Sequence, residues 1–223
     1  MVRMTTFKER EDWLNARGKR IGGSDAASVL GMNPWRSNVQ LWRIKTWREP
    51  QEDISDNPLV KYGTDAEKHI RGIYALDHPE YKVTYKGDNL WLNDEMPYAH
   101  ASLDGWLEEK ETGRKGILEI KTSTIASGTA AGKWKDIISG EDRLPTPYYC
   151  QCLHYLMVTE FEFVELVALL KDTRGEKMRE YFKTYHIERH EVEDDIKFLK
   201  EAEENFWECV TQDREPNLIL PGI

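Results

Sequence analysis

A chain of 223 residues with 39% hydrophobic and 11% aromatic residues is too apolar to be disordered, and its length suits one large domain, 1–223, rather than two. No apolar run approaches the roughly 20 residues of a membrane span and the amino terminus has no signal-peptide core, so we expect a cytoplasmic protein with no membrane partner. A net charge of −9 opposes nucleic-acid binding if it is spread evenly, and three cysteines are too few for a disulfide framework or a four-cysteine metal or iron–sulfur site.

The first third of the chain predicts three helices, separated by glycines and by a polar stretch: residues 6–17, 24–31 and 57–76. The spacing of Thr6 and Glu9 is that of a capping box, which opens the first helix. Ser24 is placed to cap the second helix, and Asn57 before a proline opens the third. The polar stretch 49–57 is therefore a loop between helices.

Strands dominate the middle of the chain. Runs of β-branched and aromatic residues between turn signals predict four strands of a meander: 81–85, 90–92, 98–108 and 115–122. Two helices, a closing strand pair and an amphipathic terminal helix follow: 128–138 and 147–158, 161–170 with 178–188, and 191–211. Helices before, between and after the strands indicate an α/β fold with a central mixed sheet flanked by helices, in which strand 115–122 is central.

Negative charge is concentrated in the terminal helix and its flanks. Between Glu191 and Glu215 there are ten acidic and three basic residues, a balance of −7 out of the total of −9. The remainder is close to neutral and contains two basic clusters: Arg17, Lys19 and Arg20, and Lys133 with Lys135. A locally basic groove for nucleic acid is therefore compatible with the acidic composition, and the terminal helix is most simply a solvated face.

The segment Leu118-Glu-Ile-Lys-Thr122 places two opposite charges two residues apart in an apolar run. Side chains alternate between the faces of a strand, so Glu119 and Lys121 share one face while Leu118 and Ile120 share the other. The charged face is either an exposed ion pair, worth about 0–1 kcal/mol, or the floor of a catalytic site.

Asp104 lies at the end of a strand-like segment that a hairpin brings beside Glu119. Two carboxylates and an ammonium group at a sheet end suit Mg²⁺ or Mn²⁺, which takes oxygen ligands and keeps several waters. Asp104, Glu119 and the backbone carbonyl of Ile120 would hold the ion against a phosphodiester. Lys121 would orient the attacking water or stabilise the transition state. The sequence leaves the number of ions open.

A resemblance to known nucleases supports the catalytic alternative. Asp104-Gly105 with Glu119-Ile120-Lys121 resembles the PD-(D/E)XK nuclease motif, in which Leu103 takes the position of the proline. Five further segments resemble, in the same order, the YqaJ and lambda-exonuclease family of viral recombination nucleases: Trp13–Arg17, Ile21–Ala27, Leu30–Pro34, Gly63-x-x-x-Glu67 and Gln151-x-x-x-Tyr155. The matching segments cover about two thirds of the chain.

The resemblance implies a restriction-endonuclease-like core and a metal-dependent 5′→3′ exonuclease of double-stranded DNA. Such an enzyme digests one strand from an end and leaves a 3′ single-stranded overhang for phage-type recombination by single-strand annealing. It also implies a homotrimeric ring, double-stranded DNA ends and an annealing protein as partners, and a phage or prophage origin in a bacterial host cell.

Residue by residue, the resemblance makes Asp104 and Glu119 metal ligands and Lys121 the catalytic lysine. Glu67 would lie near the metal, and Gln151 would orient the attacking water or the substrate, although Leu153 replaces the second glutamine of many relatives. Further expected contacts form a pocket for the 5′-phosphate: Arg17, Ser24 and Ser102.

Structural roles compete with several of these assignments. Glu67 is alternatively a solvated helix charge, and Gln151 a buried amide that pairs with the backbone. Trp35 and Trp42 either stack on bases or belong to the core. Three histidines lack the spacing of a metal-ligand pair, so we expect them to be packing or surface residues: His69, His100 and His154. Two alternative functions stay open, another endonuclease or repair nuclease of the same fold, and a non-catalytic scaffold that binds DNA ends.

Overall fold

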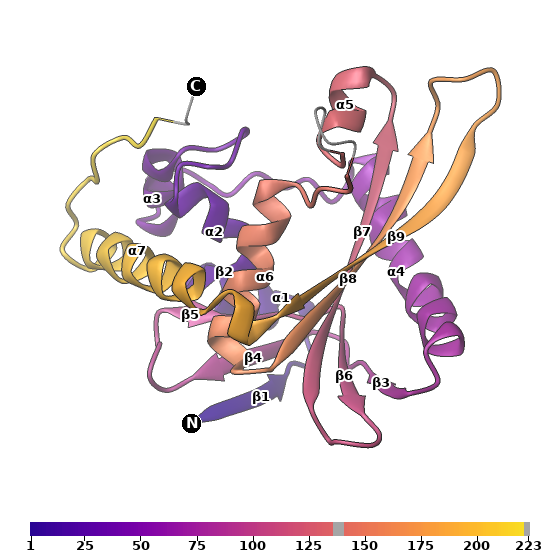
Figure 1. The fold of residues 1–223 in the computed structure, drawn as a ribbon. Helices are drawn as coiled ribbons and strands as arrows, with labels where there is room; N and C mark the ends of the chain where they lie inside the picture. The colour runs from indigo at the N-terminus through magenta and orange to yellow at the C-terminus, as the bar shows by residue number, and fades with distance from the viewer. Residues whose placement is uncertain (136–140, 221–223) are drawn as a thin grey trace.

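The computed structural model describes residues 1–135 and 141–220, and within them the central sheet has five strands. Their order is β3-β6-β7-β8-β9 (Figure 1): Tyr81–Thr84, Gly105–Glu109, Lys115–Ile125, Phe163–Asp172 and Arg179–Glu188. β7 and β8 are parallel and the other neighbours are antiparallel. The sheet is therefore mixed, with β7 at its centre, as the sequence predicts.

Helices cover both faces of this sheet. On one face, α4 (Pro58–Asp77) packs Ala66, Ile70 and Tyr74 against Leu118 and Ile120 of β7. The other face is covered by α6 (Thr146–Thr159), which in turn contacts α2 (Gly23–Val29) and α7 (Glu193–Thr211). Figure 1 shows α4 on the side of the sheet opposite to α6, α2 and α7. The predicted alternation along β7 is confirmed, because its apolar residues face α4 and its charged pair faces α6.

Short elements complete the fold. α1 (Arg10–Gly18), α3 (Asn38–Lys45) and α5 (Gly128–Gly132) lie outside the central sheet. β1 (Val2–Thr6) pairs with β4 (Asn89–Asn93), and β2 (Ile21–Gly22) pairs with β5 (Ala99–His100). A 3-10 turn, Arg189–Glu191, precedes α7. Residues 49–57 form neither helix nor strand, as expected for the loop between α3 and α4.

Two predicted helix starts are wrong. Thr6 does not cap a helix, because it is the last residue of β1 and its backbone pairs with Asn89 of β4; α1 begins only at Arg10. Ser24 is not an N-cap either, because α2 begins one residue earlier at Gly23. The backbone N–H of Gly22 donates to the carboxylate of Asp25 at 3.1 Å, so Gly22 takes the capping position.

Two predicted strand arrangements also differ. The expected strand 98–108 is interrupted between β5 and β6, and the four residues of this break include Ser102 and Asp104. The meander is incomplete because β4 leaves the central sheet and pairs with β1. The expected helix 128–138 ends at Gly132, and residues 136–140 lie outside the described part of the chain.

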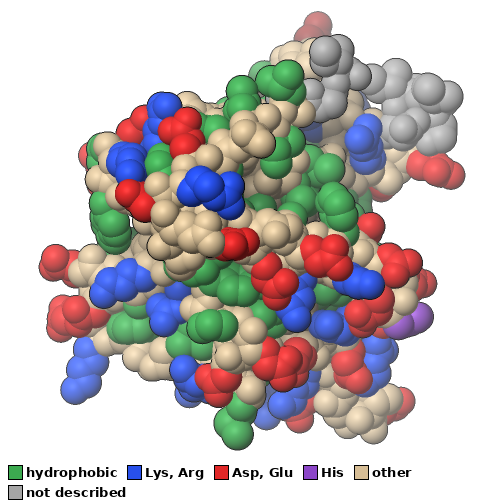
Figure 2. Space-filling view, turned by 90° about the vertical axis from the view of Figure 1, so that its left-hand side faces the viewer, with side chains coloured by type: hydrophobic (Ala, Val, Ile, Leu, Met, Phe, Trp, Pro, Cys, Tyr) green, Lys and Arg blue, Asp and Glu red, His purple; other side chains and the backbone are tan. Residues whose placement is uncertain are grey.

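α7 is acidic but not wholly solvated. Figure 2 shows acidic and basic side chains interspersed over the face that carries α7. Glu203, however, is completely buried and its carboxylate lies 2.7 Å from Nδ1 of His154 on α6. The expectation of a solvated face is therefore wrong at this position, where a buried ion pair joins the two helices. No helix in the described ranges combines the length and the apolar character needed to cross a bilayer.

Candidate active site

The candidate site lies where β6 stops covering the edge of β7. β6 begins at Gly105, which pairs with Leu118, so from Glu119 onward this edge of β7 is open. Asp104 immediately precedes β6, and its Oδ2 accepts a hydrogen bond from the backbone N–H of Ile120 at 2.9 Å. The N–H and carbonyl groups of one strand residue point to the same edge, so the carbonyl of Ile120 also faces Asp104. The break between β5 and β6 thus brings the predicted pair together.

Glu119 is the buried centre of the site, with 1% of its surface exposed. Its Oε1 accepts hydrogen bonds from Nζ of Lys121 and, at 2.7 Å, from Nε2 of Gln151. Its Oε2 is buried and has no hydrogen-bond partner among the described residues. Burial excludes the exposed ion pair that the sequence left open, and a buried carboxylate oxygen without a partner is expensive unless a cation or water completes it.

The electrostatics of the site follow from crowded carboxylates in a dry environment. Burial and the charge of Asp104 raise the pKa of Glu119 to about 8. Burial and Asp104 also raise the pKa of Glu67 to about 7. Burial alone would lower the pKa of Lys121, but the carboxylates of Glu119 and Asp104 outweigh it and raise that pKa. Lys121 therefore stays an ammonium group, whereas the acids favour a cation among them.

α4 brings Glu67 to the open edge. Glu67 is half-buried on α4, and burial and the charge of Asp104 raise its pKa, as expected for a carboxyl group near the predicted cluster. Arg71, one turn further along α4, donates a hydrogen bond to the backbone carbonyl of Asp104, and its guanidinium lies 3.8 Å from the ring centroid of Tyr85. Sequence reasoning missed Arg71. The available signal was its spacing, four residues after Glu67 on the same helix face.

α6 supplies the wall opposite the strand. Nε2 of Gln151 donates to Glu119 and lies 2.8 Å from the hydroxyl of Tyr155, so this amide bonds side chains and not the backbone. A Cβ on Gly23 would come within 2.5 Å of the ring of Tyr155 and 3.0 Å of Cγ of Gln151. The glycine therefore lets α2 approach α6 closely. Leu153 is buried in the core and contributes no second amide.

The three residues predicted for a 5′-phosphate are not joined by hydrogen bonds within the described chain. The guanidinium of Arg17 lies 4.2 Å from the ring centroid of Trp13, and Ser24 is exposed on α2. Oγ of Ser102 is buried without a hydrogen-bond partner in the described residues. Burial and the charge of Arg17 lower the pKa of His100. His100 was predicted to be a packing residue, and it is buried, but this charge coupling associates it with Arg17.

The donor set fits a hard divalent cation. The unpartnered Oε2 of Glu119, the carboxylate of Asp104 and the carbonyl of Ile120 are oxygen donors at one edge of the sheet. Within the described ranges, no group of three His, Cys, Asp or Glu side chains is arranged to hold a metal. Mg²⁺ commonly binds through one or two carboxylates and keeps waters at its other positions, so two carboxylates and a carbonyl suit it.

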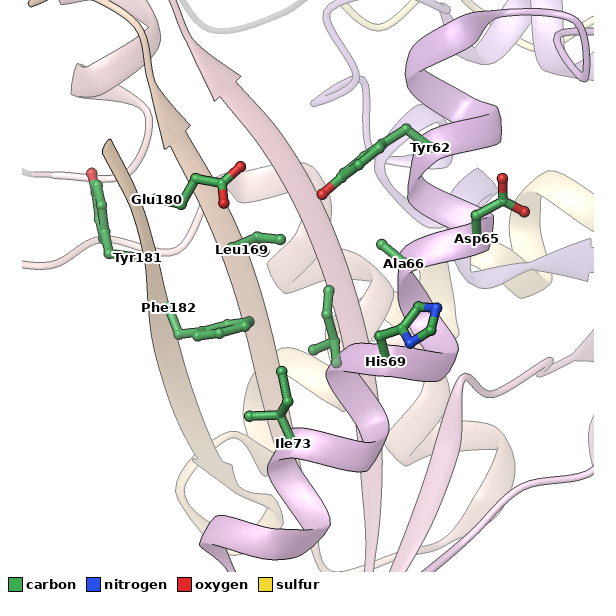
Figure 3. A pocket seen from close by; sticks show the side chains of 10 residues that line it. Tyr62, Asp65, Ala66, His69, Ile73, Leu169, Glu180, Tyr181 and Phe182 are labelled. Atoms are coloured by element: carbon green, nitrogen blue, oxygen red, sulfur yellow. The ribbon is translucent and has the colours of Figure 1, made fainter. Parts of the chain in front are cut away.

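A separate pocket of about 520 Å³ lies between α4 and the strands β8 and β9 (Figure 3). Its walls are largely apolar, with Ile73 on α4 and Phe182 on β9 extending toward the space between them. It lies on the face of the sheet that α4 covers, away from Glu119 and Lys121, and none of the acidic or lysine residues of the candidate site lines it.

Similarity to known proteins covers most of the chain. The family model of the YqaJ-like viral recombinase domain matches residues 12–162. The uncharacterized protein YqaJ of Bacillus subtilis (strain 168) is 30% identical over 154 residues, which are 69% of this chain. The match covers only 44% of the length of that relative.

Solved structures share the fold. An alkaline exonuclease, LHK-Exo, from Laribacter hongkongensis superposes with a TM-score of 0.60 and 20% identity, over 91% of this chain and 93% of that one. The same enzyme has been solved in complex with dAMP, at 19% identity and the same TM-score of 0.60. A phage related exonuclease from Haemophilus somnus 129PT superposes with a TM-score of 0.54 and 12% identity, over 89% and 98% of the two chains.

The mixed sheet with acidic and lysine side chains at the open edge of its central strand therefore has the restriction-endonuclease-like α/β fold of these exonucleases. The chain belongs to the YqaJ-like viral recombinase domain family, as the sequence resemblance indicates.

Proposed function

We propose that this protein is a metal-dependent 5′→3′ exonuclease of double-stranded DNA that leaves 3′ single-stranded overhangs for recombination by single-strand annealing. One observation supports the hydrolytic part above all: the buried, unpartnered Oε2 of Glu119 lies in one cluster with Asp104 and Lys121. The names of the structural relatives, an alkaline exonuclease and a phage related exonuclease, agree with it.

In this proposal Asp104, Glu119 and the carbonyl of Ile120 hold Mg²⁺, or alternatively Mn²⁺. When bound, the ion would supply Lewis acidity toward the scissile phosphate and lower the pKa of a coordinated water. Glu119 stays in position because Lys121 and Gln151 both hold its other oxygen. Asp104 is fixed by the N–H of Ile120 through its side chain and by Arg71 through its backbone.

Lys121 carries positive charge toward the scissile phosphate and stabilises the extra negative charge that develops during attack. Its raised pKa keeps it protonated over the working range, so it acts as an electrostatic and orienting group and not as a base. Glu67, with a pKa of about 7, can accept or release a proton at neutral pH and is the proposed group for proton transfer near the water. Gln151 orients Glu119 and, through its carbonyl oxygen, the water or substrate.

Recognition of the 5′ end is assigned to Arg17, Ser24 and Ser102. A guanidinium fork and hydroxyl groups are suitable donors for a terminal phosphate, and the buried Oγ of Ser102 has no other partner in the described chain. The complex of the relative LHK-Exo with dAMP shows that a nucleoside monophosphate binds that enzyme, which fits mononucleotide release here. Contacts to phosphate carry no sequence information, so digestion should not depend on sequence.

The biological setting is proposed from the family. We expect the chain to act as one nuclease domain over residues 1–223, as a homotrimeric ring on DNA ends, beside an annealing protein that coats the new overhang. The expected location is the cytoplasm of a bacterial host, with a phage or prophage origin.

The test uses linear and covalently closed circular duplex of the same sequence, incubated with Mg²⁺ and, in parallel, with EDTA. An end-dependent exonuclease digests only the linear DNA, and only with the metal. Strand-specific labels then report polarity: a 5′→3′ enzyme leaves the 3′-labelled strand ends as overhangs.

The alternatives give different results in the same experiment. An endonuclease of this fold also cuts the circle, and a non-catalytic scaffold cuts neither DNA although it binds linear ends. Digestion that persists in EDTA would contradict the metal assignment.

A further inference from the structure

A second cleft, of about 370 Å³, adjoins the candidate site. It lies between the loop after α2, the segment after α5 and the start of α6, and it is outside the residues assigned above. The side chains that matter here are three aromatic, two basic and one hydroxyl: Trp35, Trp134, Tyr148, Lys133, Arg143 and Ser123.

The cleft continues from the proposed catalytic lysine. Ser123 is two residues beyond Lys121 on β7, so it shares the charged face, about 7 Å further along the strand. Tyr148 belongs to both regions, because its ring centroid lies 5.3 Å from Nζ of Lys121 and its side chain lines the cleft. A chain with a phosphodiester at Lys121 would therefore extend naturally into this cleft.

Two tryptophans of the cleft differ in exposure: Trp134 is buried, whereas Trp35 is exposed to solvent. Trp134 is 3% exposed, and its ring stacks at tilted angles with Tyr148 at 5.6 Å and Tyr185 at 6.2 Å. Trp35 is 70% exposed, whereas Trp42, the other tryptophan considered for base stacking, is 3% exposed and belongs to the core. The backbone N–H of Trp35 donates to Oδ1 of Asn33 at 2.9 Å, so an anchored loop presents this exposed ring.

Two basic side chains line the cleft together with these aromatic rings: Lys133 and Arg143. Nζ of Lys133 lies 5.5 Å from the ring centroid of Trp35. Asp142, the acidic neighbour of Arg143 in sequence, is paired with Lys183. Exposed aromatic faces beside basic side chains are the chemistry that binds unpaired nucleotides, since bases stack on rings while Lys and Arg contact the phosphates.

We propose that this cleft binds the unpaired nucleotides next to the scissile phosphate of the strand being cut, with a base stacked on Trp35 and the backbone held by Lys133 and Arg143. The inference rests on the proposed nuclease function and adds a strand-separating contact to it. A duplex cannot place a single base on an exposed ring without unpairing it, so stacking on Trp35 stabilises the frayed end from which the next nucleotide is removed.

A photocross-link tests which strand occupies the cleft. Two hairpin duplexes with a 5′-phosphate are prepared, one with 5-iodouracil near the 5′ end and one with 5-iodouracil at the opposing position of the complementary strand. Each is mixed with the Lys121→Ala protein in the absence of divalent metal and irradiated. We expect a cross-link from the 5′ strand, mapped to the peptide that contains Trp35. A cross-link from the complementary strand alone, or one that Trp35→Ala leaves unchanged, overturns the proposal.

Affinity provides the second readout. Loss of one base–aromatic stack weakens binding by about 5- to 150-fold, so Trp35→Ala should raise the Kd for a frayed 5′ end by a factor in this range, while Trp35→Phe recovers most of the affinity. Phe198→Ala is the matched control, because Phe198 is 60% exposed on α7, outside the cleft. Lys133→Gln and Arg143→Gln should each reduce the salt slope by about 0.7 per lost phosphate contact.

Parallel digestion of linear duplex by the unmodified protein with Mg²⁺ separates two kinds of failure. If digestion proceeds while Trp35→Ala binds the frayed end as tightly as the unmodified protein, this cleft assignment alone is wrong. If the unmodified protein neither digests nor binds DNA ends, the proposed function fails and the cleft assignment fails with it.

Discussion

At the scale of single residues, Glu119 has the environment on which the proposed chemistry most depends. Its carboxyl group is buried and, among residues 1–135 and 141–220, only one of its oxygens accepts hydrogen bonds. Its pKa is about 8 because burial and Asp104 disfavour the charged form. At neutral pH the metal-free group is therefore mostly protonated. It gives up this proton when it binds a divalent ion, so metal affinity should rise with pH up to about 8.

Lys121→Ala should slow hydrolysis strongly without preventing binding to DNA ends. Removal of a preorganised charge from the reacting centre costs about 10²- to 10³-fold in turnover, because nothing else at the site carries positive charge to the phosphate in the same position. Single-turnover digestion and end binding, measured on the same preparation, check this result. Lys115→Ala is the control, since Lys115 is exposed on the same strand, and equal losses in both variants would contradict the assignment.

Arg17→Ala should remove the preference for 5′-phosphorylated over 5′-hydroxyl ends. A charge-assisted hydrogen bond to phosphate is worth about 1.5–3 kcal/mol, so the preference should fall by about tenfold or more while metal-dependent hydrolysis persists. Initial rates on the two kinds of end measure this ratio. Lys19→Ala, an exposed basic neighbour, should keep the preference, and equal rates on both ends for the unmodified protein would remove the phosphate pocket from the proposal.

The central residues of the site could be predicted from sequence because alternation along a strand is a local rule. Glu119 and Lys121 share a face in any strand, and Asp104 reaches them through the adjoining hairpin. For Arg71, local spacing could show only that it shares a helix face with Glu67, not what it contacts. Its contact with the carbonyl of Asp104 depends on how α4 crosses the end of β6, which is a tertiary relation that local spacing does not encode.

At the scale of secondary-structure elements, the same capping-box spacing occurs once in a strand and once at the start of a helix. Thr6 and Glu9 have capping-box spacing, yet Thr6 belongs to β1 because pairing with β4 satisfies its backbone. Ser37 and Gln40 have the same spacing and do open α3, where Ser37 accepts from the N–H of Gln40 at 3.2 Å. This helix was missed although its signal was present. Long-range strand pairing, invisible in a local window, decides between the two cases.

The glycines of α2 and α4 predict opposite effects of the same substitution. Gly23→Ala should destabilise the fold by about 1–3 kcal/mol and lower activity, because its Cβ would press on the ring of Tyr155 and displace Gln151. Gly72→Ala should stabilise the protein by about 0.4–1 kcal/mol, since Gly72 is in the interior of α4 and a Cβ there meets nothing within 4 Å. Urea unfolding measures both changes, and an unaffected Gly23→Ala would contradict close packing of α2 on α6.

The buried pair between α6 and α7 predicts a pH-dependent contribution to stability. Burial alone would lower the pKa of His154, but Glu203 outweighs burial and raises it. The contribution of the His154–Glu203 pair to the free energy of unfolding is therefore fully present below the ordinary histidine pKa of about 6.5. It is lost as the pH rises through the higher pKa that His154 has in the folded state. Glu203→Ala should cost about 3–5 kcal/mol at low pH. It should also reverse this dependence, because burial then lowers the pKa of His154 and protonation disfavours the folded state.

Urea unfolding of Glu203→Ala between about pH 5.5 and 9 checks this expectation. Glu201→Ala on the exposed side of α7 is the control and should change stability by less than about 0.5 kcal/mol. If both variants lose the same small amount, the pair contributes little and α7 is the solvated face that its composition suggests.

At the scale of the whole molecule, the arrangement of charge and layers is compatible with the proposed action of an acidic chain on DNA. The acidic helix α7 contacts α6 and lies on the side of α6 away from β7 (Figure 1), while the cleft with Lys133 and Arg143 is lined by Ser123 of β7. Sequence reasoning placed the acidic segment in a terminal helix, as the structure has it. It could not show which helix covers which face, because that choice depends on contacts between distant segments, such as α2 with α6.

The size of one chain bears on the proposed assembly. A compact chain of this length has a radius of gyration of about 17 Å, similar in scale to a DNA duplex, so one copy can contact only one side of the helix. Processive digestion requires the enzyme to stay on its substrate between cuts, and a closed ring achieves this without sequence-specific contacts. The proposed homotrimer should therefore sediment with three times the chain mass of 26.1 kDa. With DNA in excess, it should leave a mixture of fully digested and untouched duplexes.

A monomer mass together with uniformly shortened products would contradict the ring. A monomer that remains processive would show that another contact, such as the cleft at Trp35, retains the DNA.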